Sequence, residues 1–272
     1  MNSLSSQSFS VINQSSDQKA IVAHYHLFKN AGTSVDSILK QNFGTTWRKI
    51  EFPIVNRHSN SNLVQDWLTT QQDITAFSSH TAIFPLPILD DTIILPIIFL
   101  RHPITRLLSV YKFERQHQKI LNRSIKLARE KDFAGYLNKQ LNEKNNRSCR
   151  NFQTYRLSWL DNSEHRSELE RALRGLNSLP VVGIVSQFDL SMELYCQAIA
   201  QYFPSFKTKS VHKNTTSEPK ASLEQKLNVV RQSLDSNTYQ RLLDANQDDL
   251  KLYEAAKEKL RLDAKDQSKT TS

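Results

Sequence analysis

The stretch from Ile21 to Leu39, IVAHYHLFKNAGTSVDSIL, constrains the fold of this chain more than any other. Its first seven residues are mostly apolar or aromatic, as in a strand that is covered on both faces. Gly32 then permits a tight turn of the backbone. Apolar residues recur after it at helical spacing, at Val35, Ile38 and Leu39. The sequence therefore predicts a buried strand, a tight loop and a helix that starts just after Gly32.

The loop between this strand and helix has the features of an anion-binding site. The first N–H groups of a helix have no acceptor within the helix, and the helix dipole places partial positive charge there. Lys29, Thr33 and Ser34 add an ammonium group and two hydroxyl groups. We therefore expect residues 29–34 to hold a phosphate. The alternative is an ordinary strand-to-helix turn with a solvated lysine.

The same loop differs from the phosphate loop of nucleoside triphosphatases. That loop follows the pattern G-x-x-x-x-G-K-[ST], whereas here Lys29 precedes the single Gly32. The later strand candidates do not end in an aspartate that would hold Mg²⁺. The sequence therefore disfavours a nucleoside triphosphatase, and we predict no metal site.

The composition is that of a globular protein. A chain of 272 residues can bury a full core, and its 5 glycines and 23% charged residues exclude fibrous and wholly disordered classes. We predict a disordered polar leader at residues 1–18, a single α/β domain at 19–262 and a polar tail at 263–272. No signal peptide and no membrane span is recognised, and two cysteines are no disulfide framework. These features predict a cytoplasmic protein with no integral membrane segment.

The positive charge is concentrated in one region. Residues 101–150 contain thirteen lysines and arginines against four acids, an excess that equals the net charge of +9 of the whole chain. Such a region favours an anionic partner, such as a nucleotide, a charged glycan or nucleic acid. The alternative is a set of solvated helical faces. The regular interleaving of aromatic residues typical of single-strand binders is missing, which disfavours nucleic acid.

Strand and helix patterns alternate along the rest of the chain. Further strands are predicted at 49–55, 74–79, 92–100 and 180–185. Helices are predicted at 63–68, from Pro103, and at 126–141, 147–160, 164–176, 192–202, 223–234 and 238–260. Pro96 lies inside the fourth strand, which either bulges or begins there. The alternation predicts an α/β fold, with a P-loop-type central parallel β-sheet flanked by helices and extra C-terminal helices.

Polar groups follow three of the predicted strands directly. The Lys29 loop follows the first strand, His80 the third and Arg101 the fourth. Because ligands bind at the carboxyl ends of parallel strands, these groups should lie on one edge of the sheet.

Two of these segments resemble sulfotransferases that use 3′-phosphoadenosine 5′-phosphosulfate (PAPS), in particular the carbohydrate and heparan-type branch. His26 to Ser34, HLFKNAGTS, is similar to that family's H-x-P-K-x-A-G-T-S loop for the 5′-phosphosulfate, with Phe28 in place of proline. Phe99 to Tyr111, FLRHPITRLLSVY, is similar to its F-L-R-[DN]-P-x-x-R-x-x-S-x-Y element for the 3′-phosphate, with His102 in place of an acid or amide.

Weaker likenesses extend the resemblance over residues 20–257. They are Ser79-His80 for a G-H pair, residues 182–189 for a V-G-[IL]-x-E-x-F-D strand, and residues 249–253 for a D-x-x-L-Y close. Residues 153–156, Q-T-Y-R, invert the family's Q-T-R-Y order, and this departure and that at Ser79 leave the acceptor open.

The resemblance implies a reaction and its site residues. PAPS would donate its sulfuryl group, in line and without a metal, to a hydroxyl of a glycan or of a small hydroxylated acceptor. His80 would be the base, since histidine suits that role at neutral pH. Lys29 would stabilise charge on the leaving oxygen. The donor would be bound by Lys29, Asn30, Ala31, Gly32, Thr33, Ser34, Arg101 and Ser109. Unlike membrane-anchored Golgi relatives, the chain would be a bacterial-type cytoplasmic enzyme.

Other interpretations stay open. His80 can instead be a hydrogen-bonded core histidine, and we expect His26 and Arg106 to be structural. Residues 151–156 and 213–216 are further candidates to line the acceptor site or to close over the nucleotide. The alternative functions are a non-catalytic polyanion-binding protein and a kinase with a degenerate P-loop.

Overall fold

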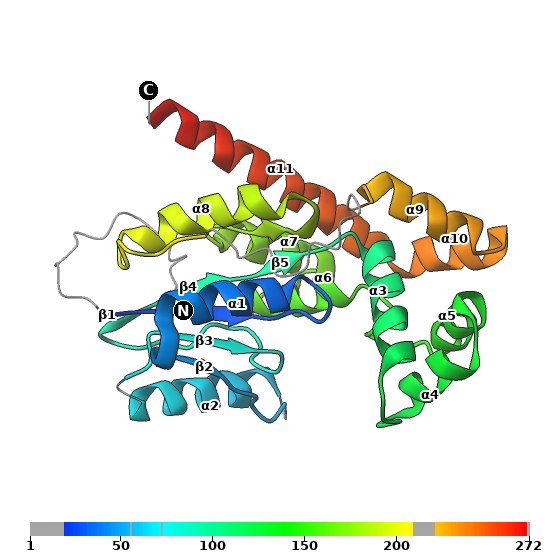
Figure 1. The fold of residues 1–272 in the computed structure, drawn as a ribbon, viewed down its shortest axis with the longest axis horizontal. Helices are drawn as coiled ribbons and strands as arrows, with labels where there is room; N and C mark the ends of the chain where they lie inside the picture. Colours follow the sequence, from blue (N-terminus) through cyan, green and yellow to red (C-terminus); the bar gives the residue numbers. More distant parts are fainter. Residues whose placement is uncertain (1–18, 55, 72, 209–220, 271–272) are drawn as a thin grey trace.

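A sheet of four parallel strands lies at the centre of the structure (Figure 1). In this computed structural model, which describes residues 19–54, 56–71, 73–208 and 221–270, the strand order is β2-β3-β1-β4. The strands are β1 (Lys19–Tyr25), β2 (Trp47–Lys49), β3 (Ala76–Ser79) and β4 (Thr92–Ile97). The register pairs Tyr25 with Ser79 and His24 with Ile97, so β1, β3 and β4 end at the same edge. The predicted α/β fold with a central parallel sheet is confirmed.

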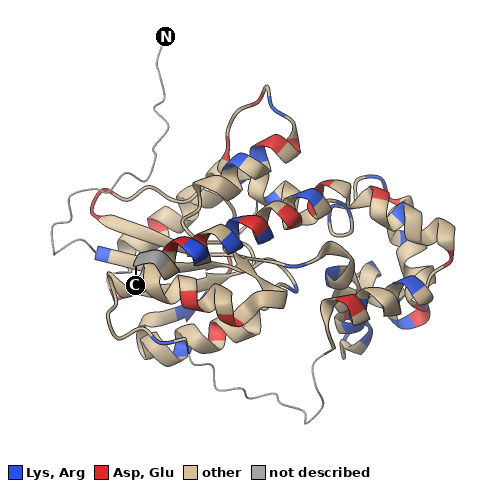
Figure 2. Ribbon diagram, turned by 90° about the horizontal axis from the view of Figure 1, so that it is seen from above, with Lys and Arg blue, Asp and Glu red and all other residues tan. Residues whose placement is uncertain are grey.

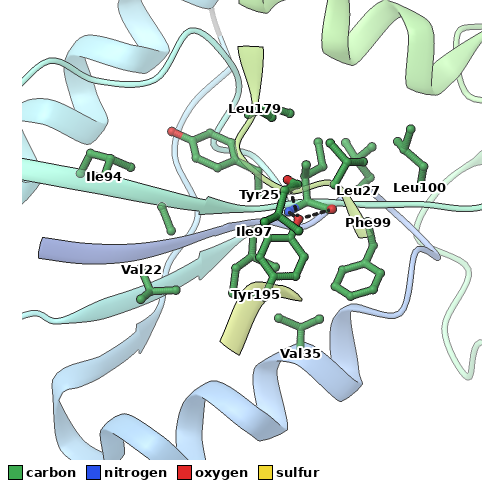
Figure 3. Packing of buried hydrophobic residues seen from close by; sticks show 14 of the residues in the cluster. Val22, Tyr25, Leu27, Val35, Ile94, Ile97, Phe99, Leu100, Leu179 and Tyr195 are labelled. Atoms are coloured by element: carbon green, nitrogen blue, oxygen red, sulfur yellow. Dashed lines mark hydrogen bonds between the residues drawn. The ribbon is translucent and has the colours of Figure 1, made fainter. Parts of the chain in front are cut away.

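The long apolar run 92–100 forms two strands rather than one. Pro96 pairs within β4, and the ladder breaks two residues later at Ile98, before β5 (Phe99–Leu100) pairs with β6 (Gly183–Ile184). The Tyr195 hydroxyl accepts a hydrogen bond from Ile98 N (3.0 Å) and donates one to Ile98 O (2.7 Å). Figure 3 shows Tyr195 inside the core, among residues of the strands. Both backbone groups of Ile98 are therefore paired at the break, as burial of polar groups requires. The prediction that Pro96 would cause a bulge or start the strand was wrong.

Eleven α-helices are described around these strands. They are α1 (Gly32–Phe43), α2 (Arg57–Thr70), α3 (Pro103–Gln116), α4 (Arg123–Glu130), α5 (Phe133–Asn142), α6 (Phe152–Leu157), α7 (Glu168–Ser178), α8 (Phe188–Ala200), α9 (Leu223–Gln232), α10 (Ser236–Ala245) and α11 (Gln247–Thr270). Figure 1 shows α3, α4, α5, α9 and α10 gathered at one end of the molecule, away from the sheet. These helices share a second hydrophobic core, which includes Leu107, Tyr136 and Leu242.

Several predicted boundaries were wrong for local reasons. The strand expected at 49–55 is only Trp47–Lys49. The helix expected at 126–141 is two helices, because the Asp132 carboxylate accepts a hydrogen bond from Gly135 N (2.8 Å) and begins α5. The helix expected at 238–260 is divided at buried Asn246, whose amide donates to Leu242 O and to Cys149 O (both 3.0 Å).

The expected polar tail is helical as far as Thr270. Acidic and basic residues alternate along α11, as Figure 2 shows, and ion pairs one turn apart include Lys259 with Asp263 (3.2 Å). Such pairs support a helix face that is not buried.

No helix in the described ranges is both long enough and apolar enough to span a bilayer. The predicted leader and the 213–216 candidate lie outside the described residues.

Candidate active site

The loop between β1 and α1 has an unusual backbone. Lys29 (φ 68°) and Ala31 (φ 64°) both adopt the left-handed conformation, which costs a non-glycine residue about 1–3 kcal/mol. Among the described residues, the N–H groups of Gly32 and Thr33 have no protein acceptor, and the Thr33 and Ser34 side chains are exposed. The loop thus presents free donors at the positive end of a helix, which is the arrangement that binds an anion.

Gly32 has a different role from the one that the sequence suggested. Its φ is not positive, and the turn is made by Lys29 and Ala31 instead. A Cβ on Gly32 would lie 1.7 Å from Nε2 of His26, so the histidine ring occupies the space that a side chain would need. His26 is only 8% exposed, which agrees with the expected structural role. Glycine is therefore required here by close packing and not by backbone conformation.

Lys29 is held between α3 and Arg101. A guanidinium N–H of Arg101 donates to Lys29 O (3.0 Å), and the Lys29 ammonium lies 4.3 Å from the centre of the Phe113 ring. Burial and the nearby Arg101 charge lower the pKa of Lys29. Because Thr105, Ser109 and Phe113 are spaced by four residues on α3, Ser109 lies on the stripe that faces this loop. The half-buried Ser109 hydroxyl forms no hydrogen bond within the described part of the chain.

A buried amide network fixes the loop from behind. Asn30, 1% exposed, donates to Phe99 O (2.7 Å) and to Gln153 Oε1 (2.8 Å). Gln153 also bonds both backbone groups of Arg101 (2.9 and 2.8 Å). The buried Asp249 carboxylate in turn accepts from the backbone N–H groups of Gln153 (3.1 Å) and Thr154 (2.7 Å). The network joins the loop, the end of β5, α6 and α11.

His80 follows β3 and is held by one carboxylate. Its Nδ1 lies 2.7 Å from Glu51 Oε1, and its backbone N–H donates to Glu51 Oε2 (3.0 Å). The ring centre is 4.0 Å from that of His26. Burial raises the pKa of Glu51, but the hydrogen bonds from His80 and Thr81 outweigh this effect, so the pKa lies below its ordinary value.

His24, His26 and Asp36 are a described group that could hold a metal ion, with possible ligand atoms within 4.8 Å of one another. The His24 ring already pairs with Asp36 (2.9 Å), and the Lys49 ammonium lies 3.5 Å from that carboxylate. Burial lowers the pKa of His24, and lowers that of His26 to about 3. Burial also raises the pKa of Asp36, but the bond from His24 reverses this effect and brings the pKa to about 2. The contact between His24 on β1 and Asp36 on α1 packs the helix against the strand.

The structure brings the Lys29 loop and His80 to one edge of the central sheet, and Arg101, which follows β5 of the second sheet, joins them through its bond to Lys29 O (3.0 Å). Arg106 is structural, being 1% exposed with its guanidinium bonded to Ser148 O (2.5 Å) and 4.4 Å from the Phe152 ring centre. The 151–156 segment supports the site: Arg156 donates to His80 O (3.4 Å) and to Ala82 O (3.1 Å).

Sequence reasoning missed two contributors to this site. Phe113 reads as one more apolar residue of a helix, and nothing marks it as the ring beside Lys29. Asp249 does have a signal in the sequence, because it opens the segment that is similar to the D-x-x-L-Y close.

Comparison with known sequences points to one family. A family model described as "Sulfotransferase family" matches residues 16–254. An uncharacterized protein of Archaeoglobus fulgidus is 36% identical over 241 residues, which cover 87% of this chain and 95% of that protein. The match includes the Lys29 loop, His80 and the Arg101 helix.

Proposed function

The chain belongs to the sulfotransferase family, and we propose that it transfers the sulfuryl group of PAPS to a hydroxyl of a carbohydrate or carbohydrate-like acceptor. The loop at residues 29–34 carries this proposal, because free N–H groups, an ammonium and Arg101 meet there at the end of the sheet. That set of donors suits a phosphosulfate. The carbohydrate branch of the family and the cytoplasmic location remain predictions.

The donor would be bound in two parts. The free N–H groups of Gly32 and Thr33 and the Lys29 ammonium would hold the 5′-phosphosulfate at the start of α1, whereas the Ser34 N–H already donates to Ala31 O (3.0 Å). Arg101 and Ser109, which face the same space from the end of β5 and from α3, would bind the 3′-phosphate. Asn30 would act by holding the shape of the loop, since its side-chain amide already donates to Phe99 O and to Gln153 Oε1.

Transfer would proceed in line. The acceptor oxygen forms a bond to sulfur as the bond from sulfur to the bridging phosphate oxygen breaks, and adenosine 3′,5′-bisphosphate leaves. Lys29 would stabilise the negative charge that develops on the bridging oxygen. His80 would take the proton of the acceptor hydroxyl, because its imidazole is part-exposed and its Nε2 has no partner among the described residues.

The basic region gives little support to the alternative of a polyanion-binding protein. Arg106 is buried, Arg147 pairs with Glu168 (2.9 Å), and Arg123 pairs with Glu143 (3.0 Å). These three of the thirteen basic side chains in the region are therefore buried or paired within the protein and do not require an anionic partner.

Calorimetry of nucleotide binding tests the proposal. Adenosine 3′,5′-bisphosphate should bind at least about tenfold, or 1.4 kcal/mol, more tightly than ATP or ADP. Oligonucleotides serve as the polyanion comparison. Transfer of radiolabelled sulfate from PAPS to a panel of glycans and small alcohols then identifies the acceptor. Tighter binding of ATP, or of oligonucleotides, would replace the sulfotransferase proposal with a kinase or a polyanion-binding protein.

A further inference from the structure

Glu51 accepts hydrogen bonds from several backbone and side-chain donors of the turn after β3. Its Oε2 accepts hydrogen bonds from the backbone N–H groups of His80 and Thr81 (both 3.0 Å). The same oxygen accepts from the hydroxyls of Thr81 (2.8 Å) and Ser79 (3.2 Å). Its other oxygen, Oε1, lies 2.7 Å from Nδ1 of His80 and has no other protein partner among the described residues. The two oxygens thus have separate tasks.

The Oε1 contact determines which nitrogen of His80 carries the proton. An ionised carboxylate can only accept hydrogen bonds, so the Nδ1 atom opposite it must be the N–H donor. In a neutral imidazole the other nitrogen, Nε2, then carries a lone pair. Nε2 forms no hydrogen bond within the described residues, and the side chain is 33% exposed. The basic nitrogen therefore remains available to an incoming hydroxyl.

We propose that Glu51 is a positioning residue, which holds His80 as the Nδ1–H tautomer and leaves Nε2 as the base. This inference rests on the proposed sulfuryl transfer. During that reaction the acceptor proton moves to Nε2, the acceptor oxygen bonds to sulfur, and the phosphate oxygen leaves. Glu51 gives up no atom; its charge stabilises the imidazolium ion that forms.

Two other roles for Glu51 fit the structure less well. As the base itself, it would have to take a proton on an oxygen that already faces His80 or on one that already accepts four hydrogen bonds. As a purely structural residue, it would need only Oε2, because both of its hydrogen bonds from the backbone of the turn end on that atom. Neither role accounts for the short contact between Oε1 and Nδ1.

The variant Glu51→Gln separates these roles, because the amide preserves the shape and reverses one hydrogen bond. The amide oxygen can still accept from the Thr81 and His80 backbone, and this places the NH₂ group opposite Nδ1. Since NH₂ can only donate, Nδ1 must become the acceptor and the proton moves to Nε2. The base is then blocked while the turn remains. We expect kcat to fall about 10²- to 10³-fold, within the range of general-base catalysis, with KM for PAPS and the Kd of adenosine 3′,5′-bisphosphate changed less than about threefold.

Two further variants serve as controls. Glu51→Asp keeps the carboxylate acceptor but is one methylene shorter. Its kcat should therefore be at least about tenfold higher than that of Glu51→Gln. Thr81→Val removes a donor to Oε2 and leaves the Oε1 contact alone. Its kcat should stay within about threefold of wild type, even where its melting temperature falls.

The tautomer itself is read by nitrogen NMR on histidine-labelled full-length protein, with the His80 signals assigned by their loss in His80→Asn. We expect the proton on Nδ1 in the wild type and on Nε2 in Glu51→Gln. A wild-type His80 protonated on Nε2, or a Glu51→Gln enzyme with unchanged kcat, overturns the inference. If Glu51→Gln fails to fold, the tautomer of wild-type His80 and the kcat of Glu51→Asp test the inference instead.

The proposed function fails separately. It fails where wild-type protein neither binds adenosine 3′,5′-bisphosphate nor transfers sulfate, whatever the tautomer. The positioning role of Glu51 fails if the wild type binds the nucleotide and transfers sulfate, and Glu51→Gln has the same kcat.

Discussion

The loop after β1 and the turn after β3 lie at the same edge of the sheet, yet they treat their polar groups in opposite ways. In the loop, the N–H groups of Gly32 and Thr33 have no protein acceptor within the described residues, and two neighbouring hydroxyls are exposed. In the turn, the backbone and hydroxyl donors end on Glu51. The loop is suited to receive a ligand, and the turn is suited to hold one side chain still. Binding and chemistry should therefore respond to different mutations.

The largest effect should come from Lys29→Ala, because this ammonium serves both binding and turnover. We expect kcat to fall by about 10³-fold, as when a preorganised donor to a transition state is lost, and donor binding to weaken as well. Radiolabel transfer measures the first and calorimetry the second. Lys40→Ala, in the last turn of α1, is the control and should change neither. A Lys29→Ala enzyme with near-normal kcat would remove the loop from the reaction.

His80→Asn should separate the two regions most clearly. It removes the proposed base, so kcat should fall about 10²- to 10⁴-fold while the Kd of adenosine 3′,5′-bisphosphate stays near that of the wild type. His58→Asn is the matched control, since His58 is exposed on α2. Loss of donor binding or of melting temperature together with activity would identify His80 as a structural histidine.

Arg101→Ala should weaken binding selectively. We expect a loss of about 10- to 100-fold for adenosine 3′,5′-bisphosphate, as for a hydrogen bond to a charged group. Adenosine 5′-phosphate should lose less, and its loss reports the bond from Arg101 to Lys29 O. Arg101→Lys tests the value of the forked geometry. Equal losses for both nucleotides would mean that Arg101 only supports the loop.

The smallest effect should be on stability below neutral pH. Burial lowers the pKa of His26 to about 3, so between pH 6.5 and 3 the unfolded chain binds a proton that the folded protein does not. The contribution of His26 to the free energy of unfolding should therefore be fully present above pH 6.5. It should fall on acidification by at most about 1.4 kcal/mol per pH unit for this group. Urea denaturation at pH 7 and pH 5 measures the slope, which should be shallower in His26→Gln. Equal slopes would place a charged His26 in the folded protein.

The sequence predicted the regions of the site better than the contacts within them. Local patterns of apolar residues were enough to place β1, α1 and α3, and therefore the shared edge that carries Lys29, His80 and Arg101. The contacts of Asn30 with Gln153 and of Gln153 with Asp249 join residues about a hundred positions apart, and no local period reports such pairs. No local pattern in the sequence marks Glu51, because its chemistry depends on a turn that begins 28 residues later. The role of Gly32 depends on a ring that only the folded structure places beside it.

The position of Asp249 has a consequence for how the protein is made. Ribosomes release a chain from its N-terminus, so the strands that carry Lys29, His80 and Arg101 emerge long before the first turn of α11. Until that turn arrives, the backbone N–H groups of Gln153 and Thr154 lack their carboxylate acceptor, and Gln153 is the side chain that aligns Asn30 with Arg101. Nascent chains stalled before residue 249 should therefore contain the sheet yet fail to retain adenosine 3′,5′-bisphosphate on a nucleotide resin. Donor binding would then be acquired near the end of synthesis. Incomplete chains would therefore not bind the proposed sulfate donor.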